Sequence, residues 1–195
     1  MVMPRHYSSI IGSVGRILGA EWFSNSQRSQ LKRYGSSCRT SGATVALNVL
    51  AQAGAPLETM APSELKNWIW LIYCMAVVSS NNRDPHNSSR SANPGFVLQS
   101  IGYSESKLSR LLDARDERFD MLLAGAAQNI GRCGKPLNWA QVAPLILAKE
   151  PEGSWAEITR IAIARDFMLA SFKSAQEARS AQSSSEEFAA AETLS

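Results

Sequence analysis

Cations stand at helical spacing among leucines in the stretch SKLSRLLDARDERFDMLL, residues 106–123. At about 100° per residue of a helix, Lys107, Arg110 and Arg118 fall within about 80° of one another. Lysine and arginine placed in this way can meet successive phosphates of a polyanion. The same spacing also occurs on faces that are simply solvated, so it indicates a candidate site and not yet a function.

One cation of this stretch does not fit a single helix. Arg115 would fall inside the apolar arc that the leucines and the phenylalanine form. We therefore predict two helices, residues 104–112 and 116–129, with a break between them. Asp116 is predicted as the N-cap of the second helix, because its carboxylate can accept hydrogen bonds from free backbone N–H groups.

A second basic cluster lies in the segment SNSQRSQLKRYG, residues 24–35, with Arg28, Lys32 and Arg33 at helical spacing. Five tryptophans could add stacking surfaces for unpaired bases. Four of them lie within apolar helical patterns, which favour packing in the core, and Trp22 near a helix end is the exception.

Common catalytic and metal-binding patterns are missing from the sequence. It contains no HExxH and no GxSxG, and the glycine-rich IIGSVGRILG lacks the Lys-Ser/Thr ending of a phosphate-binding loop. Three cysteines and two histidines form no zinc or disulfide pattern. A Cys–His nucleophile pair stays open, although Cys74 lies in an apolar helix that predicts an inert, buried thiol. The acids at 113–120 stand at helix starts, where carboxylates stabilise the helix dipole. We predict no enzyme, no metal and no cofactor.

Charge is distributed unevenly along the chain. The formal net charge is +3, but residues 1–50 hold six Lys or Arg against one acid, and residues 150–195 hold four against eight. A basic front of this kind suits a polyanionic partner. The longest apolar run, WIWLIYCMAVV, is shorter than the ~20 residues that cross a bilayer, and the first residues show no leader pattern. The sequence thus predicts a cytoplasmic protein without a membrane partner.

Apolar residues repeat at helical spacing along most of the chain, and no run alternates between apolar and polar residues. The sequence therefore predicts an all-α fold in which two small helical bundles form one elongated domain. The expected helices span residues 7–23, 24–35, 43–53, 62–78, 96–101, 104–112, 116–129, 139–148 and 154–172.

Composition suggests where this domain divides. We expect an N-terminal helix in residues 1–24 and a first bundle in residues 25–95. The polar end of that bundle, residues 79–95, is predicted to be a loop that is mobile or ordered only by a partner. A second bundle should span residues 96–173. Few bulky apolar residues follow it, which predicts a disordered or weakly helical acidic tail over residues 174–195.

Five stretches together resemble a known family. They are QLKRY at 30–34, IYCMA at 72–76, SKLSRLLDAR at 106–115, LNWAQVAPLIL at 137–147 and RIAIARDF at 160–167. In order and spacing the chain is similar to the CasB small subunit of the type I-E CRISPR surveillance complex, Cascade. The resemblance covers about residues 25 to 172.

The resemblance implies an all-helical protein without catalytic residues. In the family, two copies lie beside the CRISPR RNA within the complex, and basic faces hold the displaced non-target DNA strand. The implied partners are the other Cascade subunits with their CRISPR RNA, the displaced strand and a second copy of the chain. The break before Asp116 would then turn Arg115 outward. The residues implied to bind nucleic acid are Lys32, Arg33, Lys107, Arg110, Arg115 and Lys149.

Two other functions compete with strand binding. One is a purely structural helical adaptor, whose basic faces meet acidic protein or nothing. The other is a helix-turn-helix regulator, which needs a compact recognition helix with polar, base-reading side chains near its N-terminus. The sequence offers no convincing helix of that kind, so the adaptor is the stronger alternative.

Overall fold

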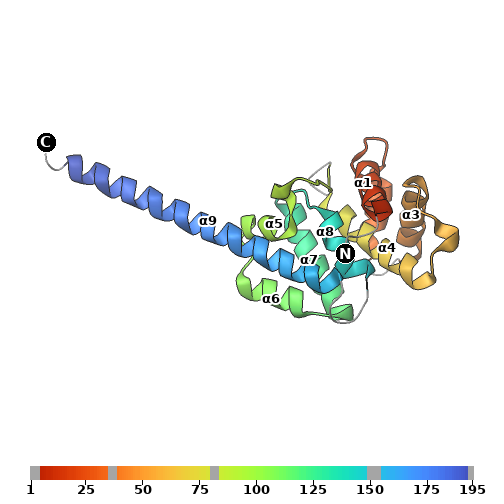
Figure 1. Ribbon diagram of the computed structural model, residues 1–195. Coiled ribbons are helices and arrows are strands. Elements are labelled where there is room, and N and C mark those ends of the chain that lie inside the picture. The colour runs from red at the N-terminus through yellow and green to blue at the C-terminus, as the bar shows by residue number, and fades with distance from the viewer. Residues whose placement is uncertain (1–4, 35–38, 80–83, 149–154, 193–195) are drawn as a thin grey trace.

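The computed structural model describes residues 5–34, 39–79, 84–148 and 155–192. Within these residues the chain forms nine α-helices and two 3₁₀ turns and contains no β-strand, which confirms the predicted all-α fold. The elements, drawn in Figure 1, are α1 (Arg5–Gly19), α2 (Asn25–Arg33), α3 (Arg39–Gln52), η1 (Leu57–Thr59), α4 (Pro62–Val78), η2 (Arg90–Ala92), α5 (Pro94–Ser100), α6 (Glu105–Asp113), α7 (Asp116–Arg132), α8 (Trp139–Leu147) and α9 (Trp155–Glu192).

Local signals in the sequence place several helix ends. At the start of α2, Ser24 Oγ accepts from the backbone N–H of Gln27 at 3.2 Å, and Gln27 Oε1 accepts from the backbone N–H of Ser24 at 3.0 Å. This reciprocal pair satisfies two donors that the helix leaves free. Helix α4 begins at Pro62, as predicted, because proline fits the first turn of a helix. After α3 the chain turns at Gly54, whose φ of 80° favours glycine.

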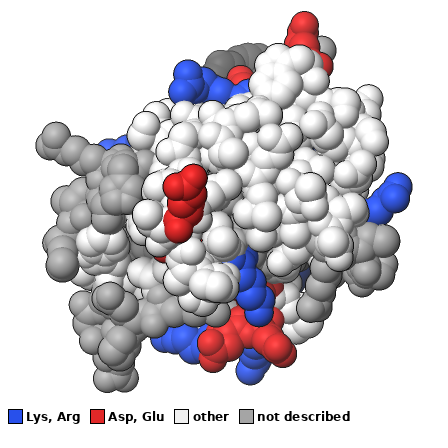
Figure 2. All heavy atoms as spheres, turned by 90° about the vertical axis from the view of Figure 1, so that its right-hand side faces the viewer, with Lys and Arg blue, Asp and Glu red and all other residues white. Residues whose placement is uncertain are grey.

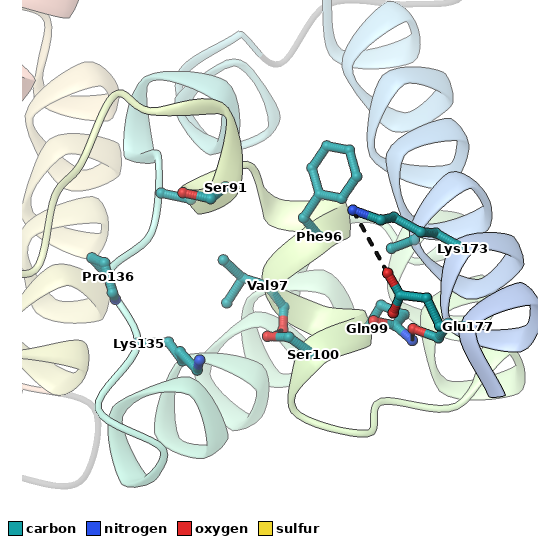
Figure 3. A pocket seen from close by; sticks show the side chains of 12 residues that line it. Ser91, Phe96, Val97, Gln99, Ser100, Lys135, Pro136, Lys173 and Glu177 are labelled. Atoms are coloured by element: carbon teal, nitrogen blue, oxygen red, sulfur yellow. Dashed lines mark hydrogen bonds and ion pairs between the residues drawn. The ribbon is translucent and has the colours of Figure 1, made fainter. Parts of the chain in front are cut away.

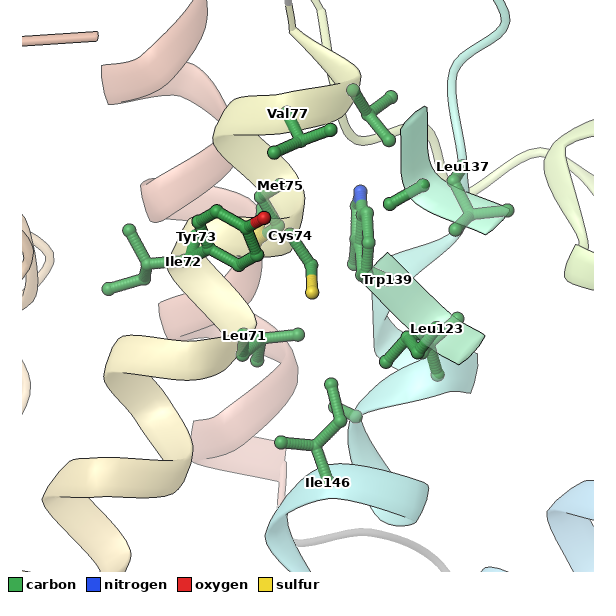
Figure 4. Packing of buried hydrophobic residues seen from close by; sticks show 14 of the residues in the cluster. Leu71, Ile72, Tyr73, Cys74, Met75, Val77, Leu123, Leu137, Trp139 and Ile146 are labelled. Carbon is green, nitrogen blue, oxygen red and sulfur yellow. The ribbon is translucent and has the colours of Figure 1, made fainter. Parts of the chain in front are cut away.

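Helix α4 lies at the centre of the fold. Residues 71–78 of this helix are all buried, as expected for a helix that is apolar on every side. It packs against α1, α2 and α3 from the first half of the chain and against α7 and α8 from the second. Figure 4 shows Cys74 of α4 and Trp139 of α8 pointing into the same space. One cluster of buried residues therefore connects helices from both halves of the chain.

The polar segment before α5 is ordered over residues 84–93, where the sequence predicted a loop that is mobile or needs a partner. The backbone N–H of Leu137 donates to the Pro85 carbonyl at 3.2 Å, and that of Asn87 donates to the Leu137 carbonyl at 3.3 Å. The indole Nε1–H of Trp139 also donates to the Pro85 carbonyl, at 2.9 Å. These partners lie about fifty positions away in the sequence, so local composition could not reveal them. Residues 80–83 of the predicted loop lie outside the described residues.

Helix α9 continues far beyond the predicted end of the second bundle, to Glu192. For residues from 174 on the sequence left disorder and weak helix open, and the described residues up to Glu192 are helical. No glycine or proline follows Gly153, and alanine, glutamine, glutamate and arginine all favour helix over coil. The expected lack of packing is visible in Figure 1, where the C-terminal part of α9 projects away from the other helices. None of the helices in the described residues has both the length and the apolar content that crossing a membrane requires.

The contact between α5 and α9 yields a stability prediction. A Cβ atom at Gly95 would collide with the backbone of α9, at the carbonyl oxygen of Ile163 and the nitrogen of Phe167. Because backbone atoms yield little, Gly95→Ala should lower the free energy of unfolding by about 2 kcal/mol and Tm by roughly 5 °C. Thermal unfolding followed by circular dichroism measures both.

Gly125→Ala serves as the control for this prediction, because a Cβ at Gly125 of α7 meets nothing within 4 Å. This change should leave Tm equal or raise it, since alanine favours helix over glycine by about 0.5–1 kcal/mol. Equal Tm values for the two variants would contradict the close packing of α5 on α9.

Candidate nucleic-acid interface

Helix α6 presents two of the predicted cations together. Its leucines are buried against the rest of the protein, whereas Lys107 and Arg110 are exposed. Three positions separate the two cations, so both project from the same side of the helix. The Lys107 Nζ lies 6.0 Å from the centre of the Tyr103 ring. The pair can therefore contact a negatively charged surface, and no buried polar group would lose its hydrogen-bond partner as a result.

Arg115 has a structural role that the sequence did not reveal. Its Nη1 donates to the carbonyl oxygens of Leu112 and Ala114, at 2.9 and 3.0 Å, and so caps the C-terminal end of α6. Its Nη2 lies 3.8 Å from a carboxylate oxygen of Glu157 on α9. The side chain is 55% exposed. Its guanidinium is thus already engaged by two helices, and its contact with a phosphate stays a prediction.

The predicted break between the two helices is confirmed, because α6 ends at Asp113 and α7 begins at Asp116. The prediction that Asp116 is the N-cap is wrong. Arg115 occupies the N-cap position without a capping side-chain hydrogen bond, and Asp116 has a φ of 49°. The backbone N–H of Phe119 donates to the Arg115 carbonyl at 3.2 Å, so the helix begins one residue earlier than the capping preference of aspartate indicates.

The predicted cations of α2 lie on another part of the fold. Lys32 and Arg33 form its last turn, and α2 packs against α3 and α4, whereas α6 packs against α7. Burial, and then repulsion from Arg28, lowers the pKa of Lys32 below the ordinary lysine value. Arg28 itself donates to the carbonyls of Leu18 and Ala20, at 3.0 and 2.9 Å, and thereby caps α1.

The predicted site residues thus form a pair on α6, with Arg115 after its end, and a separate pair on α2. Lys149 lies outside the described residues. Figure 2 looks onto the end of the molecule formed by α1, α3 and α4, where the described charged side chains of both signs are interspersed and form no continuous basic patch on this face.

The tryptophans follow the prediction of core packing in part. Trp68 and Trp139 are fully buried, and Trp70 and Trp155 are partly buried. Trp22 is 62% exposed and meets Phe23 edge-on, with 6.2 Å between the ring centres. It stands between α1 and α2, outside the apolar helical patterns, and offers a ring face near the basic helix α2 on which a base could stack.

A hollow of about 510 Å³ between α5, the chain after α7 and α9 brings together two lysines that sequence reasoning missed. Lys173 lines it next to Phe96, and Lys135 lines it on the opposite side, near Pro136 (Figure 3). The Lys173 Nζ lies 3.8 Å from a carboxylate oxygen of Glu177. Because 38 positions separate the two lysines, no sequence pattern could have joined them.

Cys74 and His86, two other groups that could carry chemistry, are engaged in the fold, whereas Cys133 is exposed. The described residues contain no cluster of three or more His, Cys, Asp or Glu that could hold a metal ion. Cys74 is fully buried, as predicted, and burial raises the pKa of its thiol far above the usual range. His86 Nδ1 accepts from the backbone N–H of Trp139 at 3.2 Å, and burial lowers the pKa of this histidine.

Comparison of the chain with protein-family models, with curated proteins and with solved structures finds no match.

The capping role of Arg115 leads to a second prediction. Arg115→Ala removes two charged hydrogen bonds to the end of α6, so the free energy of unfolding should fall by about 1 kcal/mol, a value reduced by solvent exposure. Urea denaturation measures this change. Lys107→Ala, which removes an exposed cation from the same helix, should stay within about 0.5 kcal/mol of the wild type. Equal stability of the two variants would show that the caps contribute nothing.

Proposed function

We propose that this chain is the non-catalytic small subunit of a type I-E CRISPR surveillance complex and that it holds the displaced non-target DNA strand. The proposal starts from the sequence resemblance to the CasB family. The observation that carries it is the exposed pair Lys107 and Arg110 on α6, inside the stretch that bears the resemblance. Both cations are exposed and can neutralise phosphates, whereas the buried leucines of α6 pack against the fold.

The mechanism needs no chemistry at the strand. Opening an R-loop exchanges one duplex for another of nearly equal stability, so a few contacts to the freed strand can shift the balance. Each lysine or arginine would neutralise one phosphate without reading the sequence. The small subunit would thereby slow re-annealing of the two DNA strands, and cutting would belong to a separately recruited nuclease.

The proposed setting is a cytoplasmic assembly with other Cascade subunits, their CRISPR RNA and a second copy of this chain. In this setting the α2 pair, Lys32 and Arg33, would contact a different stretch of nucleic acid from the α6 pair. Helix α2 packs against α3 and α4, whereas α6 packs against α7. Lys149 belongs to the same proposed set through the family resemblance.

A purely structural adaptor is the alternative function. The separation of the α2 pair from the α6 pair favours it, because a strand that tracks one groove needs a continuous row of cations. An adaptor predicts that reversing these charges disturbs assembly, whereas a strand-binding subunit should assemble normally and fail to protect DNA.

Charge reversal on α6 tests the proposal. In a target-bound complex reconstituted with the wild-type chain, the displaced strand should be protected from single-strand cleavage. The variant Lys107→Glu/Arg110→Glu should assemble normally and lose this protection. Loss of two phosphate contacts should also flatten the dependence of log K on log salt by about 1.4, at about 0.7 per contact.

The matched control is Lys66→Glu/Arg179→Glu, which makes the same change in net charge on α4 and on the projecting part of α9. It should retain protection. If the strand is equally accessible with the wild-type chain, with the α6 variant and without the chain, strand binding is wrong. If the α6 variant fails to assemble while the control variant assembles, the adaptor function replaces strand binding.

A further inference from the structure

The outer face of α9 carries a stripe of large apolar side chains, which we call the α9 stripe. It consists of Ile158, Ile161, Met168, Leu169 and Phe172, which are 39–68% exposed. At about 100° per residue these five positions share an arc of about 100°. They make up five of the seven large apolar side chains that are exposed in the described part of the chain. Scattered apolar residues are ordinary on a surface, but five on one face of a helix are typical of an interaction site. The exposed Arg165, between Ile161 and Met168, lies in the same arc.

The same stretch of α9 is also apolar on its inner face. Ala156, Ile163 and Phe167 are buried there, where α9 packs against α5 and α8. A helix that is apolar on two opposite faces is stable in water only when both faces are covered. The fold covers the inner face and leaves the outer face open. From Ile158 to Phe172, 15 residues, the stripe is about 21 Å long, which matches about four turns of a partner helix.

A hollow beside the stripe adds a concave end to this surface. Its volume is about 450 Å³, and it is lined by Phe96 and Leu169 together with Arg90, Ser91 and Lys173. The Arg90 guanidinium carbon lies 5.8 Å from the centre of the Phe96 ring. An apolar floor with two cations at its border can accept one large apolar side chain next to a carboxylate.

The charges around the stripe indicate which charge the partner should carry. Arg90 is exposed, and Arg165 and Lys173 are 65% and 79% exposed. Three acids lie near the stripe, and each meets a cation: Asp166 is buried and binds Arg165 at 2.8 Å, Glu177 lies 3.8 Å from Lys173, and Glu157 lies 3.7 Å from Arg160 and 3.8 Å from Arg115. With Arg90, the cations within and around the stripe outnumber these acids, and acidic side chains of a partner complement them.

We propose that the α9 stripe and its hollow bind an amphipathic helix of another protein chain, with acidic residues beside its apolar face. The apolar side chains of that helix would cover the stripe, and its carboxylates would meet Arg90 and Lys173. This inference does not depend on strand binding, because Lys107 and Arg110 take no part in it.

The chemistry of the stripe disfavours other occupants. Four of its five side chains are aliphatic or thioether groups, which offer bases no aromatic face for stacking. In a twofold pairing of two copies along the stripe, Arg165 near its centre would face its own copy, and like charges oppose such a contact. A flat lipid surface would leave the hollow beside Phe96 unfilled.

Selection from a peptide library tests this proposal and does not require the partner to be identified. The immobilised full-length chain is offered a library of helical peptides of about 15 residues, long enough to cover the stripe. Peptides that bind the variant Ile161→Glu/Phe172→Glu are removed. The surviving peptides should have apolar residues at helical spacing and acidic residues beside them. A synthetic copy of such a peptide should bind that variant at least about tenfold more weakly.

Matched variants separate the expected contacts. Arg90→Glu/Lys173→Glu leaves the stripe intact and should weaken the acidic peptide strongly. Met121→Glu changes an equally exposed apolar side chain on α7 and should bind like the wild type, as should the α6 variant Lys107→Glu/Arg110→Glu. All substituted side chains are exposed, so circular dichroism should show unchanged helix content.

Three results would overturn the proposal. The selection could yield no peptide, or only peptides that bind the stripe variant equally well. Sedimentation could reveal a dimer of the chain that Ile161→Glu dissolves, which would make a second copy the occupant. Vesicles of phosphatidylserine and phosphatidylcholine could bind the wild type but not Phe172→Glu, which would make the surface a membrane contact.

Discussion

Burial of helix α4 is the constraint on which the rest of this structure depends. Its second half is apolar on every side, so it needs neighbours all round, and no single half of the chain supplies them. Helices α1, α2 and α3 cover one side, and α7 and α8 cover the other. The cost of leaving any side open is large, because each buried side chain of this size contributes about 1.5–3 kcal/mol. Helix α6 packs against α7, and α9 packs against α8, so both proposed surfaces are positioned by helices that enclose α4.

The sequence predicted features that depend on neighbours along the chain and missed those that depend on distant contacts. The bounds of α4 follow from Pro62 and the apolar run, and the break before α7 follows from the misfit of Arg115 in an apolar arc. The order of residues 84–93 could not be predicted, since it rests on hydrogen bonds to residues 137–139. For the tail the sequence left disorder and weak helix open, because few bulky apolar residues argue against packing, whereas helix formation requires only favourable backbone propensity.

Basic residues in this protein divide into those that hold helices together and those that face solvent. Arg28 and Arg115 donate to the last carbonyls of α1 and α6, so their charge is already used to satisfy helix ends. Lys107 and Arg110 belong to the second class, because both are exposed on α6. Spacing alone gives these two classes the same appearance, because a capping arginine and a phosphate-binding arginine can stand at identical helical positions. The sequence could therefore predict the basic stretches, but only coordinates could separate their roles.

The two proposed surfaces would act together, because docking on α9 would strengthen the weak binding of nucleic acid by the basic faces. With a net charge of +3 and cations split between α2 and α6, the isolated chain can neutralise only a few phosphates at once. Binding that rests on so few contacts is weak and falls steeply with salt. A partner that docks on α9 would hold the chain beside the nucleic acid and replace a bimolecular encounter with a local one, which raises the effective concentration of the strand without any new cation. In that arrangement the apolar outer face of α9 would supply what the small basic faces lack, because assembly would fix the position in which two cations are enough.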